Sequence, residues 1–285
     1  MEKTLQLWDK IPVLIRAVII GGIVLGFGNV LTSIMLMGNM KLLPGVPWAL
    51  PATLVVLYLF WKYCRGWGFP AMTSARRKNS TRTSNIGPKV WKSVFLFGVP
   101  ALVAIVSFRL LMPSLFAVSP PDFGVDLTPF SLLTVWGLLG SVAVSAAVVE
   151  EIAFRGFLQK PLEEKYGIMP AVLIVGVVFW LAHLSHAELT YTHLPFHLLV
   201  SILLGFLVYY TKSLLPAIVL HAIGDLVLLP VYHFQKPDFM WKAVIANPVW
   251  DGQMTDTFLI FGGLLLVSLT GAAYGLVRLR KARGR

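Results

Sequence analysis

The sequence predicts an all-α fold, a polytopic bundle of about eight transmembrane helices with both termini in the cytoplasm. Of its 285 residues, 57% are hydrophobic and 13% charged, whereas soluble domains are about half apolar and a quarter charged. The 24 glycines and 18 prolines follow no period, so the chain is not collagen-like. The apolar residues gather in windows of about 20, the length with which a helix crosses the hydrocarbon layer. We therefore expect a multi-pass protein of the cell membrane.

Apolar windows with few charges follow one another along the chain. They are residues 13–37, 47–63, 90–116, 129–158, 168–186, 194–210, 214–232 and 258–277. The second and the seventh are the candidates for shorter or re-entrant segments. The first window is too long for a cleaved signal peptide, and no small-residue cleavage site follows it. We treat residues 1–285 as one membrane-embedded domain.

The charged loops predict the orientation. Residues 64–92 contain seven basic side chains and no acidic one, whereas residues 117–128 contain two aspartates and no basic side chain. Cytoplasmic loops carry an excess of lysine and arginine, so residues 64–92 form a basic cytoplasmic loop and residues 117–128 lie outside. Five more basic residues occupy 278–285, which places the C-terminus in the cytoplasm as well.

The basic loops account for the net charge of +11, so we do not expect nucleic acid as a partner. We expect the protein to interact with the lipid bilayer instead. The one cysteine, Cys64, cannot form an intrachain disulfide, and the chain has no Cys/His cluster with zinc-finger spacing. We expect neither a cofactor nor a bound metal.

The fourth window contains charged residues where a membrane span rarely carries them. Glu150 and Glu151 follow nine apolar or small residues, and Arg155 comes one helical turn after Glu151. In an α-helix the two carboxylates point about 100° apart, whereas Glu151 and Arg155 share a face in the favourable acid-first order. The spacing therefore predicts that Glu151 pairs with Arg155.

Two further windows carry paired side chains at a spacing of four residues. These are Phe179 with His183 and His221 with Asp225, each on one face of its helix. A lone histidine inside a membrane is often a hydrogen-bonded packing residue. Together with the fourth window, however, the set supplies carboxylates and two imidazoles. These groups can activate water as a general base and stabilise an oxyanion.

Three ordered motifs carry a resemblance to a known family. They are Glu150-Glu151-x-x-x-Arg155, Phe179-x-x-x-His183 and His221-x-x-x-Asp225. In this order, spacing and membrane setting they resemble the CPBP family, the CAAX prenyl endopeptidase and bacteriocin-processing group, also called ABI proteins. The resemblance covers roughly residues 130–230, the expected catalytic core, and it implies an intramembrane glutamic endopeptidase that needs no metal.

The resemblance also implies roles for the catalytic residues. Glu150 matches the carboxylate that activates the attacking water, and His183 matches the histidine that assists it. His221 and Asp225 match the pair that lines the oxyanion hole. The expected substrate is a membrane-associated peptide or protein, with or without a lipid.

The other matched positions are supporting ones. Glu151 and Arg155 match residues that hold the site, and Phe179 matches a packing position on the His183 helix. Asp225 stands where the family motif admits either Asn or Asp. It could donate to the oxyanion if burial keeps it protonated, or it could stay charged and orient His221.

Other functions stay open at this stage. A metal site of His183, His186, His221 and Glu150 is the main chemical alternative, but the chain lacks the HExxH pair expected of metal-dependent intramembrane proteases. A non-catalytic immunity or scaffold protein would not need all three motifs. A proton-coupled transporter would more typically show internal repeats.

The remaining histidines lie near the expected external ends of their windows. They are His186, His193, His197 and His233, for which we expect structural roles at the membrane interface.

Overall fold

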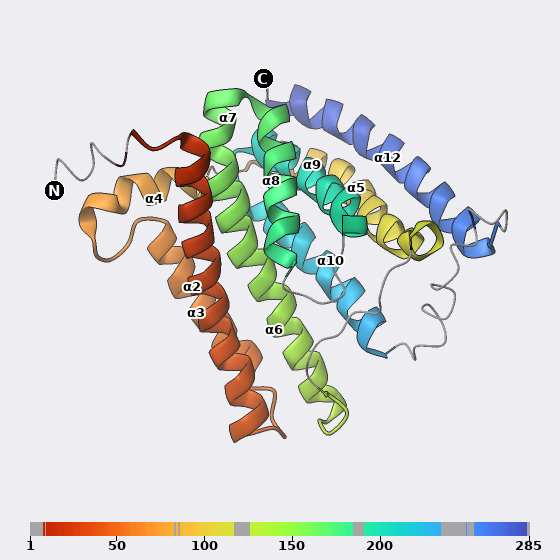
Figure 1. Cartoon of the computed structure of the whole chain (residues 1–285), viewed down its shortest axis with the longest axis horizontal. Coiled ribbons are helices and arrows are strands. Elements are labelled where there is room, and N and C mark those ends of the chain that lie inside the picture. The colour runs from red at the N-terminus through yellow and green to blue at the C-terminus, as the bar shows by residue number, and fades with distance from the viewer. Residues whose placement is uncertain are drawn as a thin grey trace. The chain divides into compact units, whose positions relative to one another are not determined.

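The computed structural model describes residues 8, 10–82, 84, 86–116, 126–184, 191–234, 249 and 254–283. Within these ranges the regular structure is helical, as predicted. In chain order the helices are α2 (Val13–Leu42), α3 (Ala49–Cys64), η1 (Ala71–Thr73), α4 (Ser74–Ser80), α5 (Pro88–Leu115), α6 (Leu132–Glu150), η2 (Glu151–Gln159), α7 (Lys160–Tyr166), α8 (Ile168–His183), η3 (Tyr191–His193), α9 (Leu194–Thr211), α10 (Leu215–Phe234) and α12 (Asp256–Arg283) (Figure 1).

The chain is an integral membrane protein. Among the described residues, five stretches are long and apolar enough to cross a bilayer: Val13–Leu42, Pro88–Leu115, Leu132–Tyr166, Leu194–Thr211 and Asp256–Ala282. Three of the predicted windows form shorter apolar helices instead, at Ala49–Cys64, Ile168–His183 and Leu215–Leu229. The sequence indicated shortening for the first and last of these three, but not for the second.

The chain packs as two compact units, each assembled from three separate segments. Unit 1 contains Met1–Ser84, Thr128–Val175 and Lys212–Ala222. Unit 2 contains Asn85–Leu127, Gly176–Thr211 and Ile223–Arg285. Both α8 and α10 begin in unit 1 and end in unit 2.

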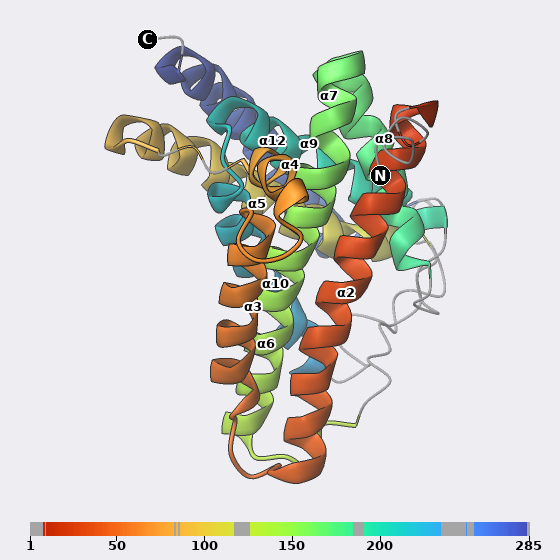
Figure 2. The ribbon, with the colours of Figure 1, turned by 90° about the vertical axis from the view of Figure 1, so that its left-hand side faces the viewer.

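In unit 1, α2, α3 and α6 lie side by side (Figure 2). The close approach of α2 to α6 depends on Gly28, because a Cβ there would lie 2.5 Å from Val149 Cγ1. Small residues let helix backbones approach in this way within membranes. The buried Asn39 fixes the α2–α3 turn: its Nδ2 donates to the carbonyls of Leu43 and Val46, and its Oδ1 accepts from the Ala49 N–H at 2.7 Å.

The segment 64–92 contains folded elements that also belong mostly to unit 1. Arg77 of α4 is buried, and its guanidinium donates to the carbonyls of Tyr63, Trp67 and Gly68 at 2.9–3.1 Å. Farther along, Arg82 forms a buried ion pair with Glu163 of α7 at 2.8 Å. These cations are therefore structural anchors as well as topological signals.

The fourth window differs from the continuous α-helix that the sequence predicts. The α-helix ends at Glu150, and residues Glu151–Gln159 form a π-helix, η2, before α7 resumes α-helical geometry. All nine residues of η2 are buried. π-Helical turns are rare and frequently occur at functional sites. At the junction itself, Glu150 and Glu151 both keep right-handed helical backbone angles.

In unit 2, α5 packs along α12, and α9 packs against both. Gly275 of α12 makes the close contact with α5 possible, because a Cβ would lie 2.5 Å from Phe97 Cα and 2.6 Å from the Leu96 carbonyl oxygen. Arg109, near the C-terminal end of α5, is buried in this unit. The packing brings this cation into the neighbourhood of the histidines at the start of α9.

Candidate active site

Four predicted site residues come together in unit 1, and we call Glu150, Glu151, Arg155 and His221 the carboxylate cluster. Glu151 and Arg155 lie on η2 with no exposed side-chain surface, and Arg155 Nη1 is 3.1 Å from Glu151 Oε1. This confirms the predicted ion pair, although a π-helical turn forms it. The distance is that of an ion pair, but the N–H direction misses hydrogen-bond geometry.

The imidazole of His221 lies between the two glutamates. Its Nδ1 is 2.9 Å from Glu151 Oε1, and its Nε2 is 3.8 Å from Glu150 Oε2. Because an ionised carboxylate can only accept, His221 Nδ1 carries the proton in the first contact. The second distance is too long for a direct hydrogen bond but short enough for electrostatic attraction.

The two glutamates differ in their access to water. The Glu150 side chain is 13% exposed and that of His221 is 11% exposed, whereas Glu151 is completely buried. Glu151 Oε2 has no hydrogen-bond partner among the described residues, so the burial of this carboxylate depends on Arg155 and His221. Of the pair, Glu150 is thus the carboxylate that a water molecule can reach.

A second group forms in unit 2, and we call Phe179, His183 and His197 the imidazole cluster. The ring centroids of Phe179 and His183 are 4.7 Å apart in an edge-to-face arrangement, as the predicted packing role of Phe179 requires. His183 Nδ1 lies 2.8 Å from the Phe179 carbonyl oxygen and donates to it. This bond fixes the tautomer, so Nε2 is the ring nitrogen of neutral His183 that can accept a proton.

His197 of α9 is a member of this cluster that the sequence did not identify as a site residue. It is buried, and its ring lies 5.0 Å from that of His183 and 5.1 Å from that of Phe179. Its Nδ1 lies 2.9 Å from the His193 carbonyl oxygen. The signal was present in the sequence, because His193 and His197 repeat the four-residue spacing of the other two polar pairs.

His193 precedes α9 and is also buried. Burial lowers its pKa from 6.5 to about 4, and the positive charge of Arg109 adds to this shift. At neutral pH the imidazole is therefore uncharged.

Asp225 lies one turn after His221 on α10 and is partly buried, so the predicted shared helix face is present. Within the described ranges, no group of three or more His, Cys, Asp or Glu side chains is arranged to hold a metal ion. His186 and the side chain of His233 lie outside the described residues.

The fold and the two clusters are those of a multi-pass helical membrane protein that carries ionisable side chains within its apolar helical segments. Residues 131–227 match the family described as Rce1-like, type II CAAX prenyl endopeptidase Rce1-like. This part of the chain is similar to that protease family, and the match agrees with the resemblance seen in the motifs. The match covers about a third of the chain and includes every predicted site residue from Glu150 to Asp225. Neither the curated proteins nor the solved structures give a match.

Proposed function

We propose that the protein is a metal-independent intramembrane glutamic endopeptidase that hydrolyses a peptide bond in a membrane-associated protein or peptide. The observation that carries this proposal is the His221 ring between a buried and a water-accessible glutamate. Such a gradient of exposure separates a carboxylate that meets water from one that holds the site together.

In the proposed reaction Glu150 is the general base. It accepts a proton from water while the water oxygen attacks the scissile carbonyl carbon, which becomes a tetrahedral oxyanion. The C–N bond then breaks, and the proton passes to the leaving amine. His183 assists Glu150, and its fixed Nδ1–H leaves Nε2 as the atom that exchanges protons.

We assign His221 and Asp225 to the oxyanion. With His221 Nδ1 donating to Glu151, Nε2 can donate to the oxyanion only when the ring carries both protons. Glu151 acts through His221, to which it is hydrogen-bonded, and Arg155 holds Glu151. Asp225 supplies a second donor when its carboxyl is protonated.

The proposed topology has about eight spans and cytoplasmic termini, in which the three shorter apolar helices complete the five long ones. Reporter fusions within residues 64–92 and 117–128 test it. We expect opposite sidedness for the two loops, and the same sidedness for both would contradict the topology.

The activity is tested with purified protein in proteoliposomes. Synthetic peptides that end in a CAAX sequence, with and without a prenyl group on the cysteine, are incubated with it, and mass spectrometry locates the cut. We expect one cleavage position and an unchanged rate after treatment with a chelator. Loss of activity on chelation and recovery with zinc would replace the glutamic mechanism with a metal-dependent one.

A further inference from the structure

The loop that joins α3 to α4 carries large apolar side chains that its own fold leaves uncovered. Trp67, Phe69 and Met72 are 58%, 89% and 54% exposed, and we call these three residues the apolar tip. They lie in the segment that the sequence predicted as a basic cytoplasmic loop. Exposed apolar patches with a charged rim mark sites of contact with proteins or membranes. The apolar tip is therefore a candidate contact surface.

The backbone beneath the apolar tip is fixed by hydrogen bonds. The buried Arg77 guanidinium donates to the carbonyls of Trp67 and Gly68, both at 3.1 Å. Ser74 Oγ donates to the Gly66 carbonyl at 2.6 Å, which closes the loop at its other end. Gly66 has a φ of +97°, and a Cβ there would lie 2.6 Å from the same Ser74 Oγ, so this turn requires glycine. The loop therefore holds its apolar side chains outward.

The apolar tip continues the exposed apolar face of α3. The large side chains of this face are 47–60% exposed, and their spacing places them on one side of the helix; they are Leu54, Val55, Tyr58 and Leu59. Lys62 follows one turn after Tyr58, and its Nζ lies 5.6 Å from the centroid of the Tyr58 ring and 4.9 Å from that of Trp67. This cation joins the two rings, so the face of α3 leads directly into the tip.

The lengths of the helices place this end of α3 at the border of the bilayer. α3 has 16 residues and extends over about 24 Å, less than the hydrocarbon layer of about 30 Å. The neighbouring α2 has 30 residues and extends over about 45 Å, the thickness of a whole bilayer with its headgroups. The first turns of α2 therefore lie among the headgroups.

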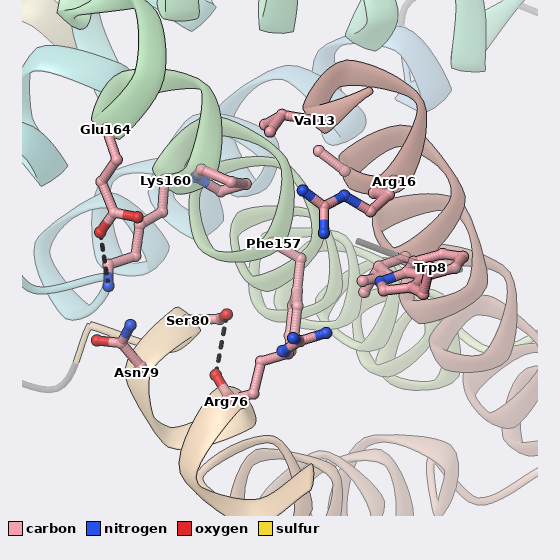
Figure 3. A pocket seen from close by; sticks show the side chains of 12 residues that line it. Trp8, Val13, Arg16, Arg76, Asn79, Ser80, Phe157, Lys160 and Glu164 are labelled. Atoms are coloured by element: carbon pink, nitrogen blue, oxygen red, sulfur yellow. Dashed lines mark hydrogen bonds and ion pairs between the residues drawn. The ribbon is translucent and has the colours of Figure 1, made fainter. Parts of the chain in front are cut away.

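α4 lies beside these first turns of α2. Val13 and Ala17 of α2 line one cavity together with Arg76 of α4 (Figure 3). α4 begins at Ser74, two residues after Met72, so the apolar tip also lies close to the headgroup layer. Figure 1 shows the segment with α4 standing out to the side of α2 and α3.

The composition of the segment fits the same layer. Residues 49–80 contain five basic side chains and no acidic one. Basic side chains at a membrane surface attract anionic lipid headgroups, and tryptophan is enriched at this depth.

We propose that the apolar tip inserts into the headgroup layer of the leaflet at the C-terminal end of α3 and anchors this loop to the membrane outside the spans. The proposed topology makes that leaflet the cytoplasmic one. The ligand of the tip is thus the lipid surface itself, with the basic side chains of the segment facing the headgroups.

The anchor reaches the candidate active site through α4. A Cβ at Gly156 of η2 would lie 3.0 Å from the carbonyl oxygen of Ser80, the last residue of α4. The same π-helix carries Glu151 and Arg155. The inserted tip therefore holds α4 in place against the helix that carries the buried ion pair.

Spin labels in proteoliposomes of phosphatidylcholine and phosphatidylglycerol test the proposal. Cys64 is replaced by alanine, and a nitroxide is attached through Ala71→Cys, inside the loop. Labels at Val55→Cys and Glu164→Cys are the references for lipid and for water, because Val55 lies on the exposed apolar face of α3 and Glu164 is an exposed charged residue of α7. Collisions with oxygen, which concentrates in lipid, and with a water-soluble nickel complex report the surroundings of each label.

We expect the Ala71 label to be relaxed more by oxygen than by the nickel complex. The Val55 label should behave in the same way, and the Glu164 label in the opposite way. None of these readouts depends on proteolysis, so they stand whether or not the proposed activity does.

A pair of double variants tests whether the apolar tip causes the insertion. Phe69→Ser with Met72→Ser removes two of its side chains and should shift the Ala71 label from oxygen to the nickel complex. Leu42→Ser with Leu43→Ser is the matched control, because it removes two exposed apolar side chains from the connection at the other end of α3. It should leave the Ala71 label unchanged.

Two results would overturn the proposal. An Ala71 label as accessible to the nickel complex as the Glu164 label would place the loop in water and leave the tip as a surface for another protein. A label that keeps its preference for oxygen in the folded Phe69→Ser, Met72→Ser protein would mean that the tip does not hold the loop in the membrane. The thermal midpoint of each variant in detergent reports whether it is folded.

Discussion

The carboxylate cluster of unit 1 and the imidazole cluster of unit 2 are both buried, but different forces hold them. In the first, a fully buried Arg155–Glu151 ion pair is joined by the His221 ring at 2.9 Å. In the second, the rings pack 4.7–5.1 Å apart, and each histidine Nδ1 donates to the carbonyl of the residue four positions earlier.

The two clusters should therefore respond differently to substitution. A buried charge without its partner is costly, so the carboxylate cluster tolerates no loss of either ion. In the imidazole cluster, each histidine ring makes its hydrogen bond to a backbone carbonyl four residues earlier in the chain, so it does not depend on a distant partner. Replacing one of these histidines removes its packing contacts and its proton-exchanging nitrogen, but it leaves no buried ion without a partner.

Arg155→Met is the substitution that should separate the two clusters most. It leaves Glu151 buried without its cation, at a cost of about 3–5 kcal/mol in the free energy of unfolding, and activity is lost with the fold. Thermal unfolding in detergent measures the effect. The double variant Arg155→Met with Glu151→Leu should recover much of the stability but no activity; failure to recover stability would mean that the ion pair is not the cause.

His183→Ala should leave the protein folded and remove catalysis. We expect peptide cleavage to fall by two to four orders of magnitude, the range for loss of a general acid or base, while the midpoint of unfolding falls by far less than in Arg155→Met. Steady-state cleavage and thermal unfolding on the same preparations make the comparison. A fully active His183→Ala protein would remove the imidazole cluster from the mechanism.

Asp225 tests whether a charge or a donor is needed beside His221. Asp225→Asn supplies a permanent amide donor and should retain substantial activity, and keep it to higher pH than the unchanged protein. Asp225→Ala should lose about 10²–10³-fold, as for removal of one oxyanion donor. If Asn proves as damaging as Ala in a folded protein, Asp225 is instead a charged partner that orients His221.

The smallest expected effect is the pH dependence of stability from His193. Its pKa is lowered by burial to about 4, below the 6.5 of the unfolded chain, so the unfolded state takes up protons first as pH falls. The contribution of uncharged His193 to the free energy of unfolding is complete above pH 6.5 and is lost as the pH falls toward 4. We expect the unfolding midpoint of His193→Gln to fall less over this window; an identical fall would exclude His193 as a source.

Hydropathy and spacing predicted the helical membrane fold and the Glu151–Arg155 pair, because both are local properties of the sequence. The spacing did not predict the π-helix at Glu151–Gln159. Its polar residues Glu151, Arg155 and Gln159 recur every four positions, a spacing that also places side chains on one face of an α-helix, so the pattern does not distinguish the two geometries.

Long-range partners were also missed. Arg82 and Glu163 are separated by 81 residues, and no local sequence pattern around either residue indicates the other. The place of His197 in the imidazole cluster was not predicted for a different reason. Its position near the start of an apolar window indicated the membrane interface, whereas tertiary packing places its ring against that of His183.

The proposed mechanism makes Glu150, the more exposed of the two glutamates, the general base. Its most direct test is the cleavage rate of Glu150→Gln beside that of Glu164→Gln, a matched change at an exposed glutamate in α7. We predict that both proteins fold, that Glu150→Gln loses at least about 10²-fold in rate and that Glu164→Gln loses none. A folded Glu150→Gln protein that cleaves at the unchanged rate would exclude Glu150 as the general base.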